Sequence, residues 1–474
     1  MMFLCCWLFL VALTHITSST NPGVQVKLTQ KGLEYGRQIG MAKIQQKLNT
    51  ITIPDISGSQ RVSPIGKVKY SLTNMHMVDV ALPQSSVDLE SDVGVRLNIA
   101  GASLSMRGNW RVKYLRVIKD SGSFTLSVNG LTITTSIAIT RDATGHPEVS
   151  VANCAASVSS VRVKFHGGAS WLYNLFSRYI DKALRSSLEK KMCPLVADAV
   201  SDLNPQLKTL NVIAKVDQFA EIEYSLVSAP PVSSSAISFN LKGEFYNIGR
   251  HQEPPFSPVA FSLPPQHDNM LYIGISAFTS NSAGFVYNTA GALSLYITDD
   301  MIPQASPFRL NTRTFGTFIP EVAKQYPNMM IKLLVKNEQT PNIILDNNNA
   351  TVQTVASVTA YAVQSNGTLS PLFILNMDAS VSGNVSINGM KLAGKVILNQ
   401  MTLTLQTSYV GDFQVRSLNS ILSMVLRWVV IPKLNVKFAE GYPLPALGKM
   451  QLVNTQLRVL KDYILIGTDV QFAG

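Results

Sequence analysis

Hydrophobic and polar residues alternate with a period of two over several long segments. Between residues 87 and 101 one parity is apolar and the other is mostly charged, with apolar positions Val87, Leu89, Val93, Val95, Leu97 and Ile99. This alternation predicts one antiparallel strand with a single buried face. A second alternation runs from Phe124 to Ile139. Its apolar residues change parity at Asn129-Gly130, which predicts a hairpin turn or a bulge at that point. Residues 149–165 add one or two further strands.

Two segments of the first half have the helical period instead. Residues 24–49 place apolar side chains at helical spacing, and residues 171–203 form a long amphipathic pattern. Gly32, Gly36 and Gly40 lie four residues apart on the first predicted helix, where each glycine costs roughly 1 kcal/mol relative to alanine. They indicate either a smooth groove for a sheet or a lipid tail, or loose packing of a partly unwound helix.

The second half repeats this order of elements after the segment SAPPVSSS (228–235), which is typical of a linker. The pattern predicts strands over 236–300, a helix over 317–335, strands over 343–409, a helix over 415–430 and closing strands over 457–472. We therefore expect an α+β fold with two related β-rich domains, each a curved antiparallel sheet covered by two helices.

The first twenty residues are predicted to be a secretory signal peptide. They hold an apolar run followed by small polar residues, although the usual basic start is missing. No later stretch approaches the roughly eighteen uninterrupted apolar residues that cross a bilayer. We therefore expect a soluble protein that is secreted to the extracellular space or stored in secretory granules.

Two cysteines, Cys154 and Cys193, remain once Cys5 and Cys6 leave with the signal peptide. In an oxidising compartment this pair predicts one disulfide. The alternative is two unpaired buried thiols. A bond between them would pin the long helix to the sheet.

The charge of the chain is positive and unevenly distributed. The net charge is +11, of which residues 21–240 carry +8 and residues 241–474 carry +3. A hydrophobic content of 46% with only 15% charged residues argues against disorder. A positive field in one half attracts anionic partners to that half. Nucleic acid is a poor candidate for a secreted chain without a nucleic-acid motif, whereas an anionic membrane or lipid headgroup fits.

The densest basic segment is RGNWRVKYLRVIK (107–119), which lies between predicted strands. Its cations are Arg107, Arg111, Lys113, Arg116 and Lys119, with Trp110 and Tyr114 among them and Asp120 at its end. Arginine binds phosphate oxygens in a bidentate manner and lysine supplies a point charge. Tryptophan and tyrosine favour the headgroup depth of a bilayer. The alternative is a solvated sheet face that only keeps the protein soluble.

Catalytic motifs are absent from the sequence. No Gly-x-Ser-x-Gly, His-Glu-x-x-His, Cys-x-x-Cys or phosphate-loop pattern occurs, and the histidines are scattered. We therefore expect neither an enzyme nor a metal site.

Three glycosylation sequons, at Asn349, Asn366 and Asn384, all lie in the second half. We expect glycans there and a basic half that is left clear for a partner.

Several short segments resemble the family of bactericidal/permeability-increasing protein and lipopolysaccharide-binding protein. They are NPGVQVKLTQKGLEYGRQIG (21–40), GKVKYSL (66–72), GNW (108–110), the two cysteines, and FAEGYPLPAL (438–447). No single match is decisive, but they follow the family's order over nearly the whole mature chain.

The resemblance implies a boomerang of two barrel-like domains joined by a central sheet. We accordingly expect a signal peptide over 1–20, a basic N-terminal domain over 21–227, a linker and central-sheet crossing over 228–249, and a C-terminal domain over 250–474. It also implies that the N-terminal domain binds the lipid A part of lipopolysaccharide. The implied contacts are Lys67, Lys69, Arg107, Trp110, Arg111, Lys113, Arg116 and Lys119. Since the stretch has fewer cations than the strongest bactericidal relatives and Asp120 closes it, killing is less firmly implied than headgroup binding.

The family also implies an apolar pocket in each domain for the acyl chains of a phospholipid, with no other cofactor. The candidate lining of the first pocket is Ile39, Ile44, Leu48, Leu172, Leu175, Phe176, Tyr179 and Leu184. Leu418, Leu422, Val425 and Val429 are the candidates for the second. The alternative for every one of these positions is ordinary hydrophobic core.

The function implied is a secreted innate-immune protein that binds lipopolysaccharide, neutralises endotoxin and kills Gram-negative bacteria at their outer membrane. One alternative is a carrier that transfers lipid between lipoprotein particles and uses its cations only for docking. Another is a sensor that delivers endotoxin to a receptor without killing.

Overall fold

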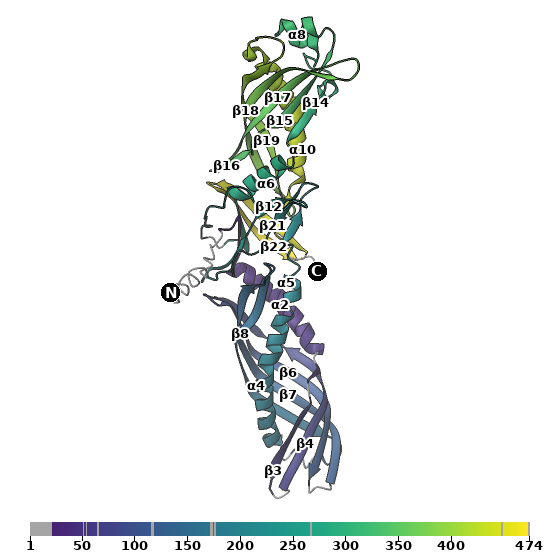
Figure 1. Ribbon diagram of the computed structural model, residues 1–474. Coiled ribbons are helices and arrows are strands. Elements are labelled where there is room, and N and C mark those ends of the chain that lie inside the picture. The colour runs from purple at the N-terminus through teal and green to yellow at the C-terminus, as the bar shows by residue number, and fades with distance from the viewer. Residues whose placement is uncertain are drawn as a thin grey trace, which may run out of the picture.

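The computed structural model describes residues 21–472, apart from residues 51, 54, 64, 65, 115–117, 171–173, 175, 176, 266, 267, 447 and 448. The molecule is elongated, with the N-terminal sheet at one end and the C-terminal sheet at the other (Figure 1). Curved antiparallel sheets dominate, so the predicted α+β class is confirmed.

The N-terminal sheet has seven strands in the order β2-β4-β6-β7-β8, with β3 paired to β4 and β5 paired to β6. Their bounds are β2 Thr52–Ile53, β3 Ile56–Val62, β4 Gly66–Ala81, β5 Gln84–Glu90, β6 Gly94–Tyr114, β7 Ile118–Arg141 and β8 Pro147–His166. Alternating residues of the long strands point to one hydrophobic core that contains Met106, Trp110, Phe124 and Leu126. Because every second residue is buried, the intervening residues face outward.

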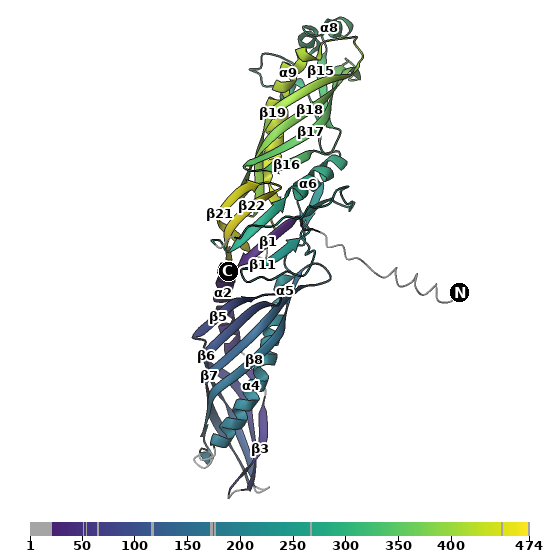
Figure 2. The same cartoon turned by 90° about the vertical axis from the view of Figure 1, so that its left-hand side faces the viewer.

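Two long helices, α2 (Gln30–Thr50) and α4 (Ser177–Ser201), accompany this sheet (Figure 2). Helix α4 runs along the edge strand β8, whose outer N–H groups have no partner strand. Side-chain oxygens of Asn174, Asp181 and Glu189 accept from the N–H groups of Phe165, Val163 and Val158 at 2.9–3.0 Å. Helix α4 and its approach therefore cover an edge that would otherwise be open to pairing.

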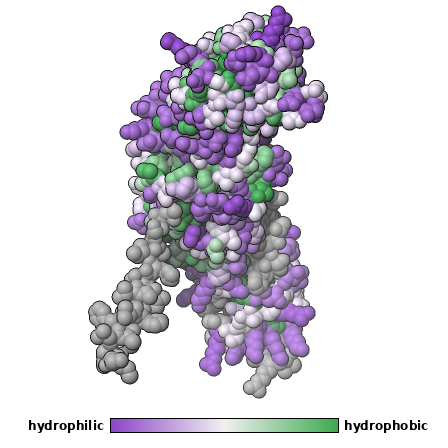
Figure 3. All heavy atoms as spheres, turned by 45° about the horizontal axis from the view of Figure 1, so that its top comes forward, coloured by the Kyte–Doolittle hydropathy of each residue, from purple (hydrophilic) through white to green (hydrophobic). Residues whose placement is uncertain are grey.

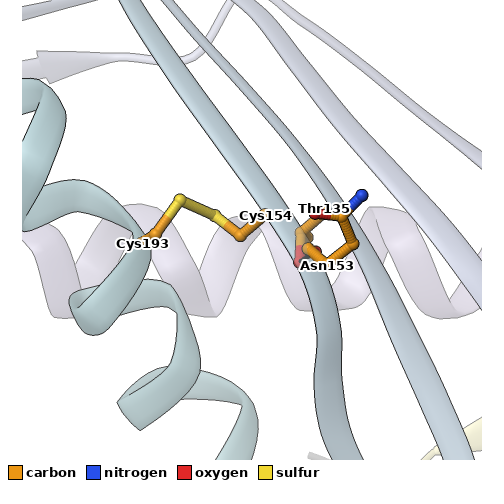
Figure 4. The surroundings of a disulfide bond; sticks show 4 residues. All are labelled: Thr135, Asn153, Cys154 and Cys193. Atoms are coloured by element: carbon orange, nitrogen blue, oxygen red, sulfur yellow. Dashed lines mark hydrogen bonds between the residues drawn. A yellow bond between two sulfur atoms is a disulfide. The ribbon is translucent and has the colours of Figure 1, made fainter.

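The disulfide between Cys154 and Cys193 joins β8 to α4, and their Cα atoms are 5.7 Å apart. Figure 4 shows it bridging strand and helix beside Thr135, whose hydroxyl donates to the Asn153 carbonyl. The predicted disulfide is confirmed.

A central sheet in the order β11-β1-β13-β22-β21 is built from distant parts of the chain. Its strands are β1 Val24–Thr29, β11 Ala236–Leu241, β13 Leu271–Ser276, β21 Met450–Leu460 and β22 Tyr463–Phe472. Beside it, β9 Ile213–Lys215, β10 Ala220–Glu223 and β12 Glu244–Asn247 form a small sheet in the order β12-β10-β9, and α5 spans Asn204–Leu207. The predicted helix over 24–49 is thus wrong at its start, because Val24–Thr29 pairs with both β11 and β13.

The C-terminal sheet has seven strands in the order β14-β15-β17-β18-β19-β20, with β16 paired to β17. They are β14 Ser294–Ile297, β15 Met330–Asn337, β16 Asn342–Asp346, β17 Asn349–Val363, β18 Leu369–Asn388, β19 Lys391–Ser408 and β20 Tyr442–Pro443. The longer helices of this half are α6 (Ala277–Thr289) and α10 (Ile431–Glu440). The shorter elements are η1 Asp299–Met301, α7 Thr312–Gly316, α8 Pro320–Gln325, η2 Val415–Leu418, α9 Asn419–Val425 and a π-helical turn at Leu426–Val430.

Three further elements differ from the sequence prediction. Residues 87–101 hold two strands, because the chain turns between Glu90 and Gly94, where Asp92 has a φ of 62°. The predicted helix over 317–335 is wrong, since α8 is short and β15 occupies the rest. Helix α6 lies where only strands were expected. At Asn129-Gly130 the structure has a bulge inside β7 opposite β6, one of the two forms predicted.

Candidate functional site

The outward face of β6 carries cations near the end of the molecule farthest from the central sheet. Arg107, Arg111 and Lys113 are exposed, whereas Gly108, Trp110 and Val112 between them are buried. Figure 3 shows hydrophilic side chains gathered at this end. We call Lys67, Lys69, Arg107, Arg111, Lys113 and Lys119 the basic tip; all six are exposed.

The strand register places three lysines in one row across the sheet. Lys69 of β4 lies directly opposite Lys113 of β6, which lies directly opposite Lys119 of β7. Like charges in directly opposed positions destabilise a sheet. A bound anion would relieve this repulsion, so the row is suited to hold one.

A second row extends the positive face to the sheet edge. Arg107 lies opposite His76 and Thr125, and Thr125 in turn lies opposite Lys164 of β8. Lys67 lies opposite Arg61 of β3. Lys164 and Arg61 were not among the predicted contacts. The alternation in VRVKF (161–165), with Val161, Val163 and Phe165 buried, could have found Lys164.

Among the residues that the structure describes, no carboxylate neutralises the basic tip. Within the part of the chain that the structure describes, none of its six cations forms an ion pair with Asp or Glu. Asp120 lies opposite Val112, on the side of the sheet away from the lysine row. Its carboxylate accepts from the N–H groups of Ser121 and Ala169, both at 2.8 Å. Asp120 ends the cationic run in the sequence, but its carboxylate lies away from the lysine row and binds these two backbone N–H groups.

Trp110 is a correction to the predicted contacts. Its side chain is fully buried, its Nε1 donates to the carbonyl of His166 at 3.1 Å, and its ring packs edge-on against Phe165. Successive side chains of a strand point to opposite faces, so the strand that exposes Arg111 buries Trp110. Trp110 therefore packs in the core on the opposite face of the sheet from the basic tip. Arg116 lies outside the described residues.

The predicted N-terminal pocket is described only in part. Leu172, Leu175 and Phe176, and the side chains of Ile44, Leu48 and Tyr179, lie outside what the structure describes. Ile39 is half-buried, and Leu184 is fully buried in the sheet core, so Leu184 is a core residue.

The glycines of α2 divide into two kinds. A Cβ at Gly32 would lie 2.6 Å from the Met270 carbonyl oxygen, so this glycine lets the central region pack closely. A Cβ at Gly36 or Gly40 would meet nothing within 4 Å among the described atoms. The close approach of the Met270 backbone to α2 therefore explains Gly32, but it does not explain Gly36 or Gly40.

An apolar cavity of about 460 Å³ lies in the C-terminal half, between the sheet and helices α6 and α10. That size falls in the ≈ 300–1,000 Å³ range of ligand pockets. The apolar part of its lining from the C-terminal helices is Leu426, Val430, Ile431, Leu434 and Phe438. Helix α10 has no fully buried residue, so it forms a roof over the cavity and not a part of the core.

The four residues predicted to line this pocket do not line it. Leu418, Leu422, Val425 and Val429 are all buried in the C-terminal core. The π-helical turn Leu426–Val430 changes the phase of the helix and turns the following apolar residues toward the cavity. The missed signal was the apolar pattern Ile431, Leu434, Phe438 around and beyond Pro432, because the sequence prediction ended the helix at Val430, before that proline.

Polar groups around the cavity are few. The lysines Lys395, Lys433 and Lys437 belong to the lining, which contains neither Asp nor Glu. Burial raises the pKa of Tyr442 to about 12, and the Tyr224 hydroxyl donates to the Pro443 carbonyl. In the described chain no group of three His, Cys, Asp or Glu side chains is placed to hold a metal, and no helix there is long and apolar enough to cross a bilayer.

The chain is similar to known proteins over its whole length. The LBP / BPI / CETP family matches with its N-terminal domain over residues 32–205 and its C-terminal domain over residues 214–472. A bactericidal permeability-increasing protein of Sebastes schlegelii is 71% identical over 100% of both chains. A lipopolysaccharide-binding protein of Homo sapiens is 32% identical over 95% of this chain and 94% of its own.

Among solved structures, a crystal structure of lipopolysaccharide binding protein is 32% identical and matches with a TM-score of 0.62. It covers 95% of this chain and 99% of its own. The names of these proteins describe binding or bacterial killing and not catalysis, as expected from the sequence.

Proposed function

The chain belongs to the LBP / BPI / CETP family, and on that premise we propose that it is a secreted innate-immune protein that binds the lipid A part of lipopolysaccharide at the basic tip. In this proposal the C-terminal cavity, and a second pocket beneath the N-terminal helices, hold acyl chains of phospholipid. The protein acts at the outer membrane of Gram-negative bacteria, where binding neutralises endotoxin. The name of the 71% identical relative supports bacterial killing as part of that function.

The observation that carries the proposal is the row formed by Lys69, Lys113 and Lys119 without an opposing carboxylate. Ammonium groups held side by side repel one another, and phosphate oxygens bridge them with charge-assisted hydrogen bonds. Arg107 and Arg111 on the same face add bidentate donors. Each basic group close to an anionic membrane is worth about 1 kcal/mol, so the six cations together can hold the protein on a bacterial surface.

Charge reversal tests the proposal directly. The variant Lys69→Glu, Arg107→Glu, Arg111→Glu, Lys113→Glu is compared with a matched control that reverses the exposed lysines Lys324, Lys336, Lys449 and Lys461. Binding of immobilised lipopolysaccharide should fall more than a hundredfold in the first variant and less than threefold in the second. Equal affinity of the two variants would defeat the assignment of the tip, and circular dichroism checks that both are folded.

A lipid carrier is the second candidate, and the cavity of about 460 Å³ favours it. A carrier moves phospholipid between particles even when the tip is reversed, whereas an endotoxin-binding protein loses its main ligand. Transfer of a fluorescent phospholipid between vesicles separates the two functions. A sensor that only delivers endotoxin would bind lipopolysaccharide normally and leave bacteria viable in a killing assay.

A further inference from the structure

We propose that N-glycans on Asn349 and Asn384 lie side by side on the outer face of the C-terminal sheet. Together they cover the exposed isoleucines Ile344 and Ile397 and keep this face from pairing with a second copy of the protein. The inference rests on the secretion that the proposed function includes, because N-glycans are added in the secretory pathway. It does not depend on lipid binding.

The strand register brings these two sequons together, although they are far apart in the sequence. Ala350 of β17 pairs with Gly383 of β18, and Figure 2 shows the two strands side by side. Asn349 and Asn384 are the next residues along these antiparallel strands at the same end, so they adjoin. The Cβ atoms of directly opposed residues are about 4.5–5.5 Å apart. Two glycans at this spacing form one carbohydrate patch.

Both asparagines point to the outer face and are accessible. Asn384 is exposed, whereas its neighbours Gly383 and Val385 are half-buried above the cavity. Alternation along the strand therefore directs the Asn384 side chain outward. Asn349 is exposed as well, and its Nδ2 donates to the hydroxyl of Thr351, the third residue of its own sequon, at 3.2 Å. A glycan on Nδ2 leaves one N–H for that bond.

An apolar row crosses the same face of the sheet. Ile344 of β16 lies opposite Thr351, which lies opposite Ser382 of β18. Ser382 in turn lies opposite Ile397 of β19. Ile344 is 41% exposed and Ile397 is 66% exposed. The two isoleucines thus flank the strands that carry the sequons.

Each asparagine has one of these isoleucines as its diagonal neighbour. The residues that pair with Ile344 and Ile397 are two positions from Asn349 and Asn384 in the same strands. Diagonal neighbours of this kind are about 7–8 Å apart. Sugar rings have apolar C–H faces, so the first sugar on each asparagine can pack against one isoleucine.

Without sugars this face would match a second copy of itself. The row that contains the two asparagines begins with Asp346 and ends with Lys395, and both are exposed. A two-fold axis along the strands, between β17 and β18, places Asp346 of each copy over Lys395 of the other. The same axis places Ile344 over Ile397. N-glycans are bulky and hydrated, so two of them at the centre of this face hold a second copy away.

Glycopeptide mass spectrometry and sedimentation velocity test the proposal on the full-length chain, expressed in a mammalian secretory cell line. The test variant is Asn349→Gln, Asn384→Gln. The matched control is Asn366→Gln, which removes the third sequon. Asn366 lies in the turn between β17 and β18, at the opposite end of these strands.

We expect Asn349 and Asn384 to carry glycans in most molecules, and the native protein and the control to sediment as monomers. The test variant should dimerise at least about tenfold more tightly than the control. Adding Ile344→Thr and Ile397→Thr to the test variant should restore the monomer. Lipopolysaccharide binding should stay unchanged throughout, because the basic tip lies in the other half of the molecule.

A second measurement keeps the proposal testable should the variant not fold. Glycans are removed enzymatically from the folded native protein in dilute solution, and exposed side chains are labelled with hydroxyl radicals. Labelling of Ile344 and Ile397 should then rise towards that of Val259, which is 78% exposed and serves as the internal reference.

Four results would overturn the inference and leave the proposed function standing. They are an unglycosylated Asn349 or Asn384 beside a glycosylated Asn366, a test variant as monomeric as the control, dimers that persist after both isoleucines are replaced, and labelling that glycan removal does not change. A secreted-cell product without a glycan at any of the three sequons would instead contradict passage through a glycosylating compartment, and with it the secretion in the proposed function.

Discussion

At the scale of single residues, the position of a residue in the strand register decides whether its side chain is exposed and which side chains it meets. Residue type decides this less. Lys113 is the middle member of a row of three lysines, so it meets a like charge on both sides. Trp110, three residues earlier in β6, was predicted as a lipid contact from its residue type, its place in the basic stretch and the family resemblance, yet the parity of β6 buries it. The same parity rule turns the Asp120 carboxylate away from the cations and toward the N–H of Ala169.

The row predicts a trade between stability and binding at Lys113. Lys113→Gln removes two repulsive pairs, so the free energy of unfolding should rise by about 0.2–1 kcal/mol. Affinity for lipopolysaccharide should fall about tenfold, since one phosphate contact is lost. Urea unfolding and equilibrium binding measure the two effects, with Lys324→Gln as control. A variant that is both less stable and weaker in binding would show that the lysine has a structural role instead.

Glu244 predicts a pH dependence of stability. It is buried beside Glu253, with Lys242 at 3.8 Å, and burial first and the Glu253 hydrogen bond second raise its pKa to about 7. The unfolded chain releases this proton near the ordinary value of 4.5. The folded state thus binds more protons between these pH values, and the free energy of unfolding falls as pH rises through that window.

Urea titrations at pH 5 and pH 7.5 measure this effect in the native protein and in Glu244→Gln. The glutamine variant cannot titrate, so its stability should change less between the two pH values. An identical pH dependence in both proteins would place the effect in other groups.

At the scale of elements, α4 acts as a substitute for a missing strand. Its side chains bond the outer edge of β8 at several points, and the disulfide adds a covalent one. Helix α10 makes fewer such contacts with β19. The side chain of Asn435 accepts from the Val396 N–H and donates to the Val396 carbonyl, and no residue of the helix is fully buried. The first helix therefore completes a core, while the second covers a cavity.

Removing the disulfide should loosen the attachment of α4. The bond closes a loop with a sequence separation of 39 residues, for which the chain-entropy relation gives about 4 kcal/mol. We expect Cys154→Ala, Cys193→Ala to lose stability of that size in thermal and urea unfolding. Hydrogen exchange should increase in β8 and α4 and stay unchanged in β17 and β18. Uniform loss of protection would contradict a local role.

The type of an element could be predicted from the sequence where apolar residues repeat with one clear spacing over a long segment. The strands around Arg107, an irregularity at Asn129-Gly130 and the disulfide follow from alternation and cysteine count, although alternation did not decide between a hairpin turn and a bulge. The strand Val24–Thr29 was missed because its pairing partners, β11 and β13, are more than two hundred residues away in sequence. The cavity lining was missed because a π-helical turn shifts the helix phase, and side-chain spacing alone does not reveal such a turn.

At the scale of the whole molecule, the two candidate binding regions lie in opposite halves of an elongated chain (Figure 1). The basic tip is at the far end of the N-terminal sheet, and the cavity lies between the C-terminal sheet and its helices. The family resemblance inferred from the sequence is confirmed by matches to both domains. The uneven charge, +8 in the first half and +3 in the second, directs anionic surfaces to the tip first.

The most direct test of the account is the affinity of the unmodified protein for lipid A with and without its phosphates. In the proposed function the lysine row and its neighbouring arginines bind lipid A through its phosphate oxygens, so enzymatic dephosphorylation of lipid A should weaken binding at least a hundredfold, about 2.7 kcal/mol. The loss should shrink in the charge-reversed variant, in which four of the six cations of the basic tip are replaced by glutamate. Equal affinity of the native protein for phosphorylated and dephosphorylated lipid A would contradict the account.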